Sequence, residues 1–230
     1  MRCATALAAA VLLLVARPAA PAEPGGSGHP LGIGEPRAPE PFTLAQRYLD
    51  AARRGDRATL ERALELGADP RAKDDLGRSA LLLAAMDVGS LELVRLLHAR
   101  GVPVDEPDLG GRTALSFAAG GGRLEIVRWL LEQGAQLDRP DVLGRRPLYH
   151  AVGNGARDVV AFLLERGADP NAADQFRDTA LMQACVQGRG EIAALLLARG
   201  ADPALRNQEG RTAADRAAPG TDACLPAAAP

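Results

Sequence analysis

The sequence predicts an all-α solenoid in which short helical hairpins stack side by side, and three observations support this fold class. Landmark residues recur about every 33 positions along most of the chain. Between these landmarks, Leu and Ala recur at positions i, i+3 and i+4, which is the spacing of one helical face. Aromatic residues make up only 3% of the 230 residues, and so few large rings favour thin layers of closely packed helices.

Two recurring turn positions define the period. A Gly opens one turn, and an Asp or Asn stands seven residues later, with successive intervals of 34, 33, 33 and 33 residues at both positions. These residues are Gly67, Gly101, Gly134, Gly167 and Gly200, followed by Asp74, Asp108, Asp141, Asp174 and Asn207. One such unit cannot bury its apolar faces alone, so we expect adjacent units to stack.

The first helix of each unit is expected after a residue whose hydroxyl can accept hydrogen bonds from the free amides of the first turn. Successive units hold Ser79, Thr113, Arg146, Thr179 and Thr212 at this position. Arg146 lacks a hydroxyl, but Pro147 directly after it still favours a helix start. A Gly then breaks the helix in each unit, at Gly89, Gly122, Gly155 and Gly188.

The second helix follows that Gly, as in residues 124–133 and 157–166, and its apolar residues recur at i, i+3, i+4 and i+7. The Gly at its end supplies a left-handed cap. In three units an Asp-Pro pair then starts an extended turn, because Pro disfavours helix in the residue before it. The first full unit has one extra residue in the segment AAMDVGS, residues 84–90, which accounts for the 34-residue interval.

The period and the pattern D-x-x-G-x-T-x-L-x-x-A-x-x-x-G resemble the ankyrin repeat. The segment RRPLYHAVGNG, from Arg145, is the most similar to the T-P-L-H-x-A core of that family. The resemblance implies an ankyrin-repeat solenoid of helix-turn-helix units with β-turn fingers over residues 42–218. Its expected parts are an N-terminal capping unit at 43–73, four full repeats at 74–106, 107–139, 140–173 and 174–206, and a truncated C-terminal unit at 207–218.

The sequence departs from the family pattern at two kinds of position. The family His after Pro-Leu is absent, and those positions hold Leu82, Ser116, Tyr149 and Met182. Its usual hydrogen bond must therefore be replaced or omitted. Arg177 stands where the other finger turns have Gly, so we expect strain or a reshaped turn there.

The first 22 residues have the pattern of a secretory signal peptide. Arg2 precedes an apolar run of 13 residues, and small residues stand at the two key positions before a cut at Glu23. The run is shorter than the roughly 20 residues that span a bilayer, and an uncleaved anchor or a buried helix is the alternative. A signal peptide predicts a periplasmic or secreted protein, and its Ala-rich style is typical of bacteria.

The segments on either side of the repeats lack apolar periodicity. Residues 23–41 are rich in Pro and Gly and are expected to form a flexible linker. Residues 219–230 have a similar composition and are expected to be a disordered tail. After cleavage of the signal peptide we expect no membrane span.

The sequence contains no pattern typical of an active site or a metal centre. The three His residues do not have the spacing of metal ligands with each other or with Cys. There is no G-x-S-x-G elbow, and GGGR at residues 120–123 lacks the GK[ST] ending of a phosphate loop. The net charge of −2 gives no basic excess for nucleic acid. We therefore expect no catalytic residue, no metal, no cofactor and no nucleic-acid partner.

Two cysteines, Cys185 and Cys224, remain after removal of the signal peptide. In an oxidising compartment an even count indicates a disulfide. However, Cys185 occupies a packed position of an inner helix, where a buried free Cys acts as a small apolar residue. Both interpretations stay open at this stage.

The resemblance implies that a partner protein binds the concave groove formed by the turn tips and the first helices. The candidate partner-binding residues are Leu76, Arg78, Met86, Arg112, Phe117, Leu143, Arg145, His150, Asn154, Phe176, Gln183 and Gln187. Apolar anchors flanked by Arg are typical of protein interfaces. The alternative is that the apolar tip residues pack against the neighbouring finger and that each Arg pairs with the Asp of its own turn.

We therefore expect a non-catalytic protein–protein interaction module that is a monomer on its own. An inhibitor, an immunity protein or an accessory protein for an exported enzyme would fit this description. The alternative is an enzyme or a small-ligand-binding protein with an unrecognised pocket.

Overall fold

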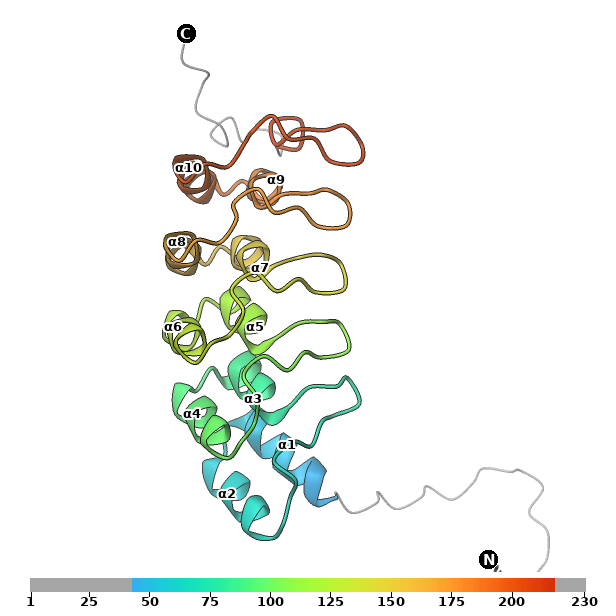
Figure 1. Ribbon diagram of the computed structural model, residues 1–230, viewed down its shortest axis with the longest axis vertical. Coiled ribbons are helices and arrows are strands. Elements are labelled where there is room, and N and C mark those ends of the chain that lie inside the picture. Colours follow the sequence, from blue (N-terminus) through green and yellow to red (C-terminus); the bar gives the residue numbers. More distant parts are fainter. Residues whose placement is uncertain (1–42, 218–230) are drawn as a thin grey trace, which may run out of the picture. The chain divides into compact units, whose positions relative to one another are not determined.

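The computed structural model describes residues 43–217 of the chain (Figure 1). The predicted signal peptide, linker and tail, at 1–22, 23–41 and 219–230, lie outside the described residues and stay predictions. Within the described range, no helix is long and apolar enough to cross a membrane.

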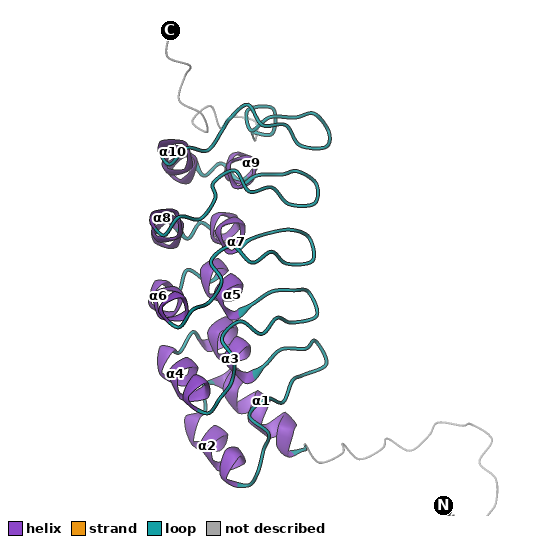
Figure 2. Cartoon of the chain, viewed as in Figure 1, coloured by secondary structure: helices purple, strands orange, loops and turns teal. Residues whose placement is uncertain are grey.

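The described residues form helical hairpins joined by long loops, and residues 43–217 contain no β-strand (Figure 2). The elements are α1 (Leu44–Arg54), α2 (Arg57–Glu65), α3 (Ala80–Leu83), a π-helical turn η1 (Ala84–Val88), α4 (Leu91–Ala99), α5 (Ala114–Gly120), α6 (Leu124–Glu132), α7 (Pro147–Asn154), α8 (Arg157–Glu165), α9 (Ala180–Val186) and α10 (Gly190–Ala198). The predicted all-α solenoid is confirmed.

The helices lie in two parallel rows. The odd-numbered helices form an inner row, in which α1, α3, α5, α7 and α9 contact one another in sequence. The even-numbered helices form an outer row behind them (Figure 1). The loops project from the inner row, on the side away from the outer row (Figure 2). We call the surface formed by these loops and the inner helices the inner face.

The inner helices begin where the hydroxyl residues predict. Ser79, Thr113 and Thr179 accept hydrogen bonds from the backbone amides three residues later. Thr43 forms a capping box with Gln46 at the start of α1. Arg146 makes no capping hydrogen bond, and Pro147 is the first residue of α7 instead.

The extra residue of the first full repeat is accommodated by the π-helical turn η1. One added residue in an α-helix is commonly absorbed as a single turn with i to i+5 hydrogen bonds. Here the Gly89 amide donates to the Ala84 carbonyl at 3.0 Å, and Gly89 ends the turn with a positive φ of 65°. The insertion places Met86 and Asp87 at the edge of the inner face.

The core lies between the two rows and runs continuously through the stack. The inner row contributes many small residues to it, such as the buried pairs Ala84–Ala85 and Ala118–Ala119, beside larger ones such as Leu115. The outer helices contribute larger ones, such as Leu97, Leu130 and Leu163. Small side chains on one row allow the two rows to approach closely, which explains how a chain with few aromatic residues fills its interior.

Five finger loops, at residues 74–78, 108–112, 141–145, 174–178 and 207–211, share one backbone conformation. In each, the amide of the first residue donates to the carbonyl of the fifth at 2.9 to 3.1 Å. The first side chain, Asp or Asn, accepts from the amide of the fifth residue at 2.8 to 3.0 Å. The fourth residue has a positive φ, including Arg177 with a φ of 61°. The predicted strain at Arg177 is therefore a backbone conformation that L-residues disfavour.

One backbone hydrogen bond joins each finger to the next. The amide of the second residue donates to the third residue's carbonyl in the preceding finger at 2.8 to 3.0 Å. The donors are Leu109, Val142, Gln175 and Gln208, and the acceptors are Leu76, Gly110, Leu143 and Phe176. The fingers therefore form a linked row rather than independent loops.

Candidate functional site

The predicted partner-binding residues lie along the inner face, on the fingers and on the inner helices. They differ in how far solvent reaches them. Leu76, Asn154, Phe176 and Gln187 are exposed, whereas Arg78, Met86, Arg112, Phe117, Leu143, Arg145, His150 and Gln183 are half-buried. The prediction that they bind a partner stays a prediction.

Three finger Arg residues pair with the Asp of their own turn, as the alternative interpretation expected. Arg78 pairs with Asp74, with Nε 2.8 Å from Oδ2. The corresponding distances are 3.1 Å for Arg112 and Asp108 and 3.0 Å for Arg145 and Asp141. Burial alone raises the pKa of Asp141, but hydrogen bonds from the Arg145 side chain and backbone outweigh burial and hold that pKa below its ordinary value.

In two of these ion pairs the Arg side chain is accessible to solvent and the Asp side chain is not. In fingers 108–112 and 141–145, the Asp side chains are 1% and 0% exposed, while the Arg side chains are 37% and 31% exposed. Their hydrogen bonds to Asp use Nε and Nη2. The accessible end of each pair is therefore the guanidinium, and the carboxylate lies beneath it.

A hollow of about 280 Å³ opens between η1, α5 and α7. It brings together five of the twelve predicted residues. Its lining consists of Met86, Arg112, Ser116, Phe117, Gly120, Gly121, His150 and Asn154. The guanidinium carbon of Arg112 lies 4.4 Å from the centre of the Phe117 ring, which is a cation–π distance. The hollow thus combines a thioether, an aromatic ring, a guanidinium and three further polar side chains, those of Ser116, His150 and Asn154.

His150 links the hollow to the ion pair of the next finger. Its Nε2 lies 3.2 Å from Asp141 Oδ2, without the alignment of a hydrogen bond. Burial lowers the pKa of His150 below its ordinary value, although Asp141 acts in the opposite direction. Arg145 and Arg112 also lower it. His150 is therefore held mainly neutral near pH 7.

The finger tips carry one exposed apolar side chain each in the first four fingers. Leu76 and Phe176 were predicted, and they are 52% and 51% exposed. Leu143, the third predicted apolar finger residue, is half-buried. The exposed tips of the second and third fingers are Leu109 and Val142, which the sequence analysis missed. Both stand directly after the landmark Asp of their finger, and an apolar residue at that turn position is the sequence signal that could have identified them.

The inner face is closed by side-chain contacts toward its C-terminal end. Tyr149 Oη donates to Gln183 Oε1 at 3.1 Å, which joins α7 to α9. Gln187 Oε1 accepts from Arg189 Nε at 2.6 Å. Asp178, which interrupts the row of finger Arg residues, pairs with Arg216 and accepts from Asn207.

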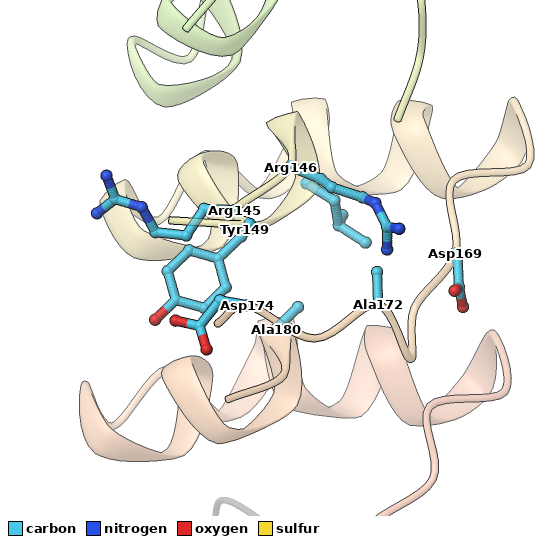
Figure 3. Close-up of a pocket in the computed structure, with 9 residues that line it drawn as sticks. Arg145, Arg146, Tyr149, Asp169, Ala172, Asp174 and Ala180 are labelled. Atoms are coloured by element: carbon cyan, nitrogen blue, oxygen red, sulfur yellow. The ribbon is translucent and has the colours of Figure 1, made fainter. Parts of the chain in front are cut away.

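A small cavity lies between two repeats, beside the start of α7 (Figure 3). Arg146 and Tyr149 face Ala172 and, from the next repeat, Ala180 across it (Figure 3). Its volume is about 10 Å³, close to that of a single water probe. The buried Arg146 Nε has no hydrogen-bond partner there. The cavity is too small for a ligand and reflects imperfect packing around an Arg at a helix cap.

The described residues contain no group of three His, Cys, Asp or Glu arranged to hold a metal ion. Cys185 is fully buried in α9 and is disulfide-bonded. Cys224, its predicted partner, lies outside the described residues, so the pairing of Cys185 with Cys224 stays a prediction.

Stacked helical hairpins with linked finger loops define a repeat solenoid. The family model for ankyrin repeats (3 copies) matches residues 49–141, 83–174 and 148–225. The chain therefore belongs to the ankyrin-repeat family. Among curated proteins, none matches this sequence significantly. Ankyrin repeats generally mediate protein–protein interaction.

Proposed function

We propose that this chain is a non-catalytic module that binds another protein across its inner face. The observation that carries the proposal is that four successive fingers each expose an apolar tip, at Leu76, Leu109, Val142 and Phe176, on the face that also holds the hollow and the accessible guanidinium groups. Exposed apolar residues gathered on one surface mark interaction sites. An apolar centre bordered by Arg is the composition that protein interfaces favour.

The test uses the mature full chain as bait in extracts of the native cell envelope, followed by mass spectrometry. The double variant Leu109→Asp/Val142→Asp places two charges on exposed tips, which are 73% and 65% exposed. Since these side chains are not in the core, the fold is expected to persist. One protein should be retained by the wild-type chain and lost with the double variant.

The matched control is Leu66→Asp. Leu66 is 58% exposed at the end of α2, outside the fingers, and this variant should retain the protein. Substitution of Arg145 is avoided, because it would leave the buried carboxylate of Asp141 without its partner. Retention of the same protein by the double variant, or capture of none by the wild-type chain, would contradict the proposal.

We also propose that the protein acts outside the cytoplasm, in the periplasm or after secretion. The support is the pattern of residues 1–22. In that compartment the chain would serve as an inhibitor, an immunity protein or an accessory factor of an exported enzyme. Cell fractionation with N-terminal sequencing tests the location, and the mature chain should begin at Glu23. A chain that begins at Met1 in the cytoplasmic fraction would overturn it.

A further inference from the structure

The hollow on the inner face allows a more specific statement about the partner, which rests on the proposed function. A volume of about 280 Å³ lies just below the range of roughly 300–1,000 Å³ typical of sites for drug-sized ligands. It suits one large side chain. Single side chains seated in such pockets commonly provide most of the binding energy at a protein interface.

The lining of the hollow favours an aromatic side chain. Met86 contributes a thioether, and sulfur makes favourable contacts with aromatic rings. Phe117 is half-buried and can pair with a second ring at its edge. Gly120 and Gly121 line the hollow without side chains of their own, and a Cβ at Gly120 would come within 3.2 Å of the Asn154 side chain. An aliphatic side chain would fill the space but would not use these contacts.

The charge around the hollow favours an acidic neighbour. The guanidinium groups of Arg112 and Arg145 are the accessible ends of their ion pairs, and both are close enough to His150 to lower its pKa. Nη1 of each makes no hydrogen bond to another described residue. A guanidinium can accept a carboxylate through such donors. A partner carboxylate next to the aromatic side chain would therefore meet positive charge.

A second copy of this chain fits the hollow less well. Its most exposed aromatic residue among the described ones is Phe176, at a finger tip. The residue after it is Arg177, which is also exposed. Insertion of Phe176 would bring this Arg toward Arg112, and like charges repel.

We propose that the hollow binds one aromatic side chain of the partner protein and that Arg112 and Arg145 bind a carboxylate beside it in the partner's sequence. The recognised element is thus a short acidic–aromatic segment. This proposal assigns the chemistry of the segment and not the identity of the protein that carries it.

The experiment uses a synthetic peptide library with a variable central residue and variable flanking residues, bound to the mature full chain. The central residue is Tyr, Trp, Phe or Leu, and the flanking residues are Glu, Ala or Lys. Peptides with an aromatic centre and Glu flanks should bind about tenfold or more tightly than those with Leu at the centre or Lys at the flanks, since tenfold corresponds to about 1.4 kcal/mol.

Two variants separate the aromatic contact from the charge contact. Phe117→Gln introduces the residue found at the equivalent position 183 and should abolish the preference for aromatic centres. Asp108→Asn/Arg112→Gln removes both charges of one pair and should weaken only the preference for Glu flanks. Asn207 shows that Asn can hold a finger turn, because its side chain accepts from the Glu209 and Arg211 amides.

Gln133→Ala is the matched control, because this exposed residue lies at the end of the outer helix α6, outside the inner face. It should bind the library like the wild-type chain, and all variants should keep the wild-type circular dichroism spectrum. Equal binding of Leu and aromatic peptides would overturn the proposal. So would unchanged binding by Phe117→Gln, or self-association that is lost with Phe176→Ala. If the peptide test fails in this way, but envelope extracts still yield a protein whose retention requires Leu109 and Val142, the proposed function survives.

Discussion

At the scale of single residues, Arg177 shows how one substitution leaves a repeated turn intact but strained. The fourth finger position needs a positive φ, and the equivalent residues Gly77, Gly111, Gly144 and Gly210 have φ values of 73° to 77°. Arg177 adopts a φ of 61° because two hydrogen bonds between Asp174 and Asp178 close the turn around it. The local structure therefore follows the repeat and overrides the preference of the residue.

Arg177→Gly is expected to stabilise the protein by about 1 kcal/mol, because Gly removes a left-handed penalty of about 1–2 kcal/mol but adds freedom to the unfolded chain. For a domain of this size the melting temperature should rise by about 2–4 °C, measured by thermal denaturation. Arg177→Ala, which removes the side chain and keeps the strain, should change it little. A lower melting temperature for Arg177→Gly would contradict this account.

His150 gives a pH-dependent contribution to stability. Burial lowers its pKa in the folded protein, so the unfolded chain binds a proton more readily. The contribution of His150 to the free energy of unfolding is therefore fully present above the ordinary His pKa of about 6.5, and it is lost as the pH falls below that value. Asp141 opposes this effect, and Arg145 and Arg112 reinforce it.

His150→Gln should therefore make the fall in unfolding free energy between pH 7 and pH 5.5 shallower. Urea denaturation at several pH values measures this difference. The chain already has Gln183 at the equivalent position of the next repeat, which makes Gln a compatible replacement. If His150→Gln had the same pH dependence of stability as the wild-type chain, the burial of His150 would not be its cause.

At the scale of secondary-structure elements, Arg residues join successive hairpins where inner helices end. Arg123, just before α6, donates to the carbonyls of Met86, Asp87 and Val88 in the π-helical turn at 3.0 to 3.2 Å. Arg189, just before α10, donates to one carbonyl, that of Gly153, at 3.0 Å. The carbonyls at the end of a helix lack partners within it, so a cation there is favourable. Arg123 therefore secures the insertion that borders the hollow.

Arg123→Met should destabilise the protein by about 1–3 kcal/mol, as expected for lost hydrogen bonds to a charged group. Arg189→Met should cost less, because fewer carbonyls lose their donor. Chemical denaturation of both variants gives the comparison. If Arg189→Met proved the more destabilising of the two, the role assigned to Arg123 would be wrong.

Much of the element structure could be predicted from the sequence, because the repeat multiplies weak local signals. The hydroxyl caps, the Gly breaks and the extra residue near Met86 all have the structural effect that the pattern indicates. Two of the four exposed tips, Leu109 and Val142, could not be assigned, since the turn sequence does not reveal which of two adjacent side chains points outward. Leu143 and Val142 illustrate this limit. The orientation of the Arg–Asp pairs likewise depends on burial that only the folded stack provides.

At the scale of the whole described stack, polar side chains tie one repeat to the next along the loops after the outer helices. Asp105 accepts from the Gln136 amide at 2.9 Å, and Asp138 accepts from the Asp169 amide at 3.3 Å. Asn171 accepts from the Asp202 amide at 2.7 Å. Together with the finger bonds, these contacts connect neighbours only. Each repeat is therefore stabilised by those beside it, as in other solenoids.

We propose that a bridge between Cys185 and Cys224 secures the last full repeat, in which Cys185 lies in α9. Peptide mapping of the oxidised protein should find the two residues in one linked peptide. Removal of a native disulfide typically costs about 2–5 kcal/mol, so reduction should lower the unfolding free energy measurably. Free thiols at both residues in the oxidised protein would contradict the pairing.

The finger bonds have one further consequence. They use backbone atoms and the first side chain of each turn, whereas the tip side chains take no part in them. Mutations at the tips can therefore accumulate with little penalty to folding. A lineage carrying this architecture is free to exchange one target for another while its framework stays the same.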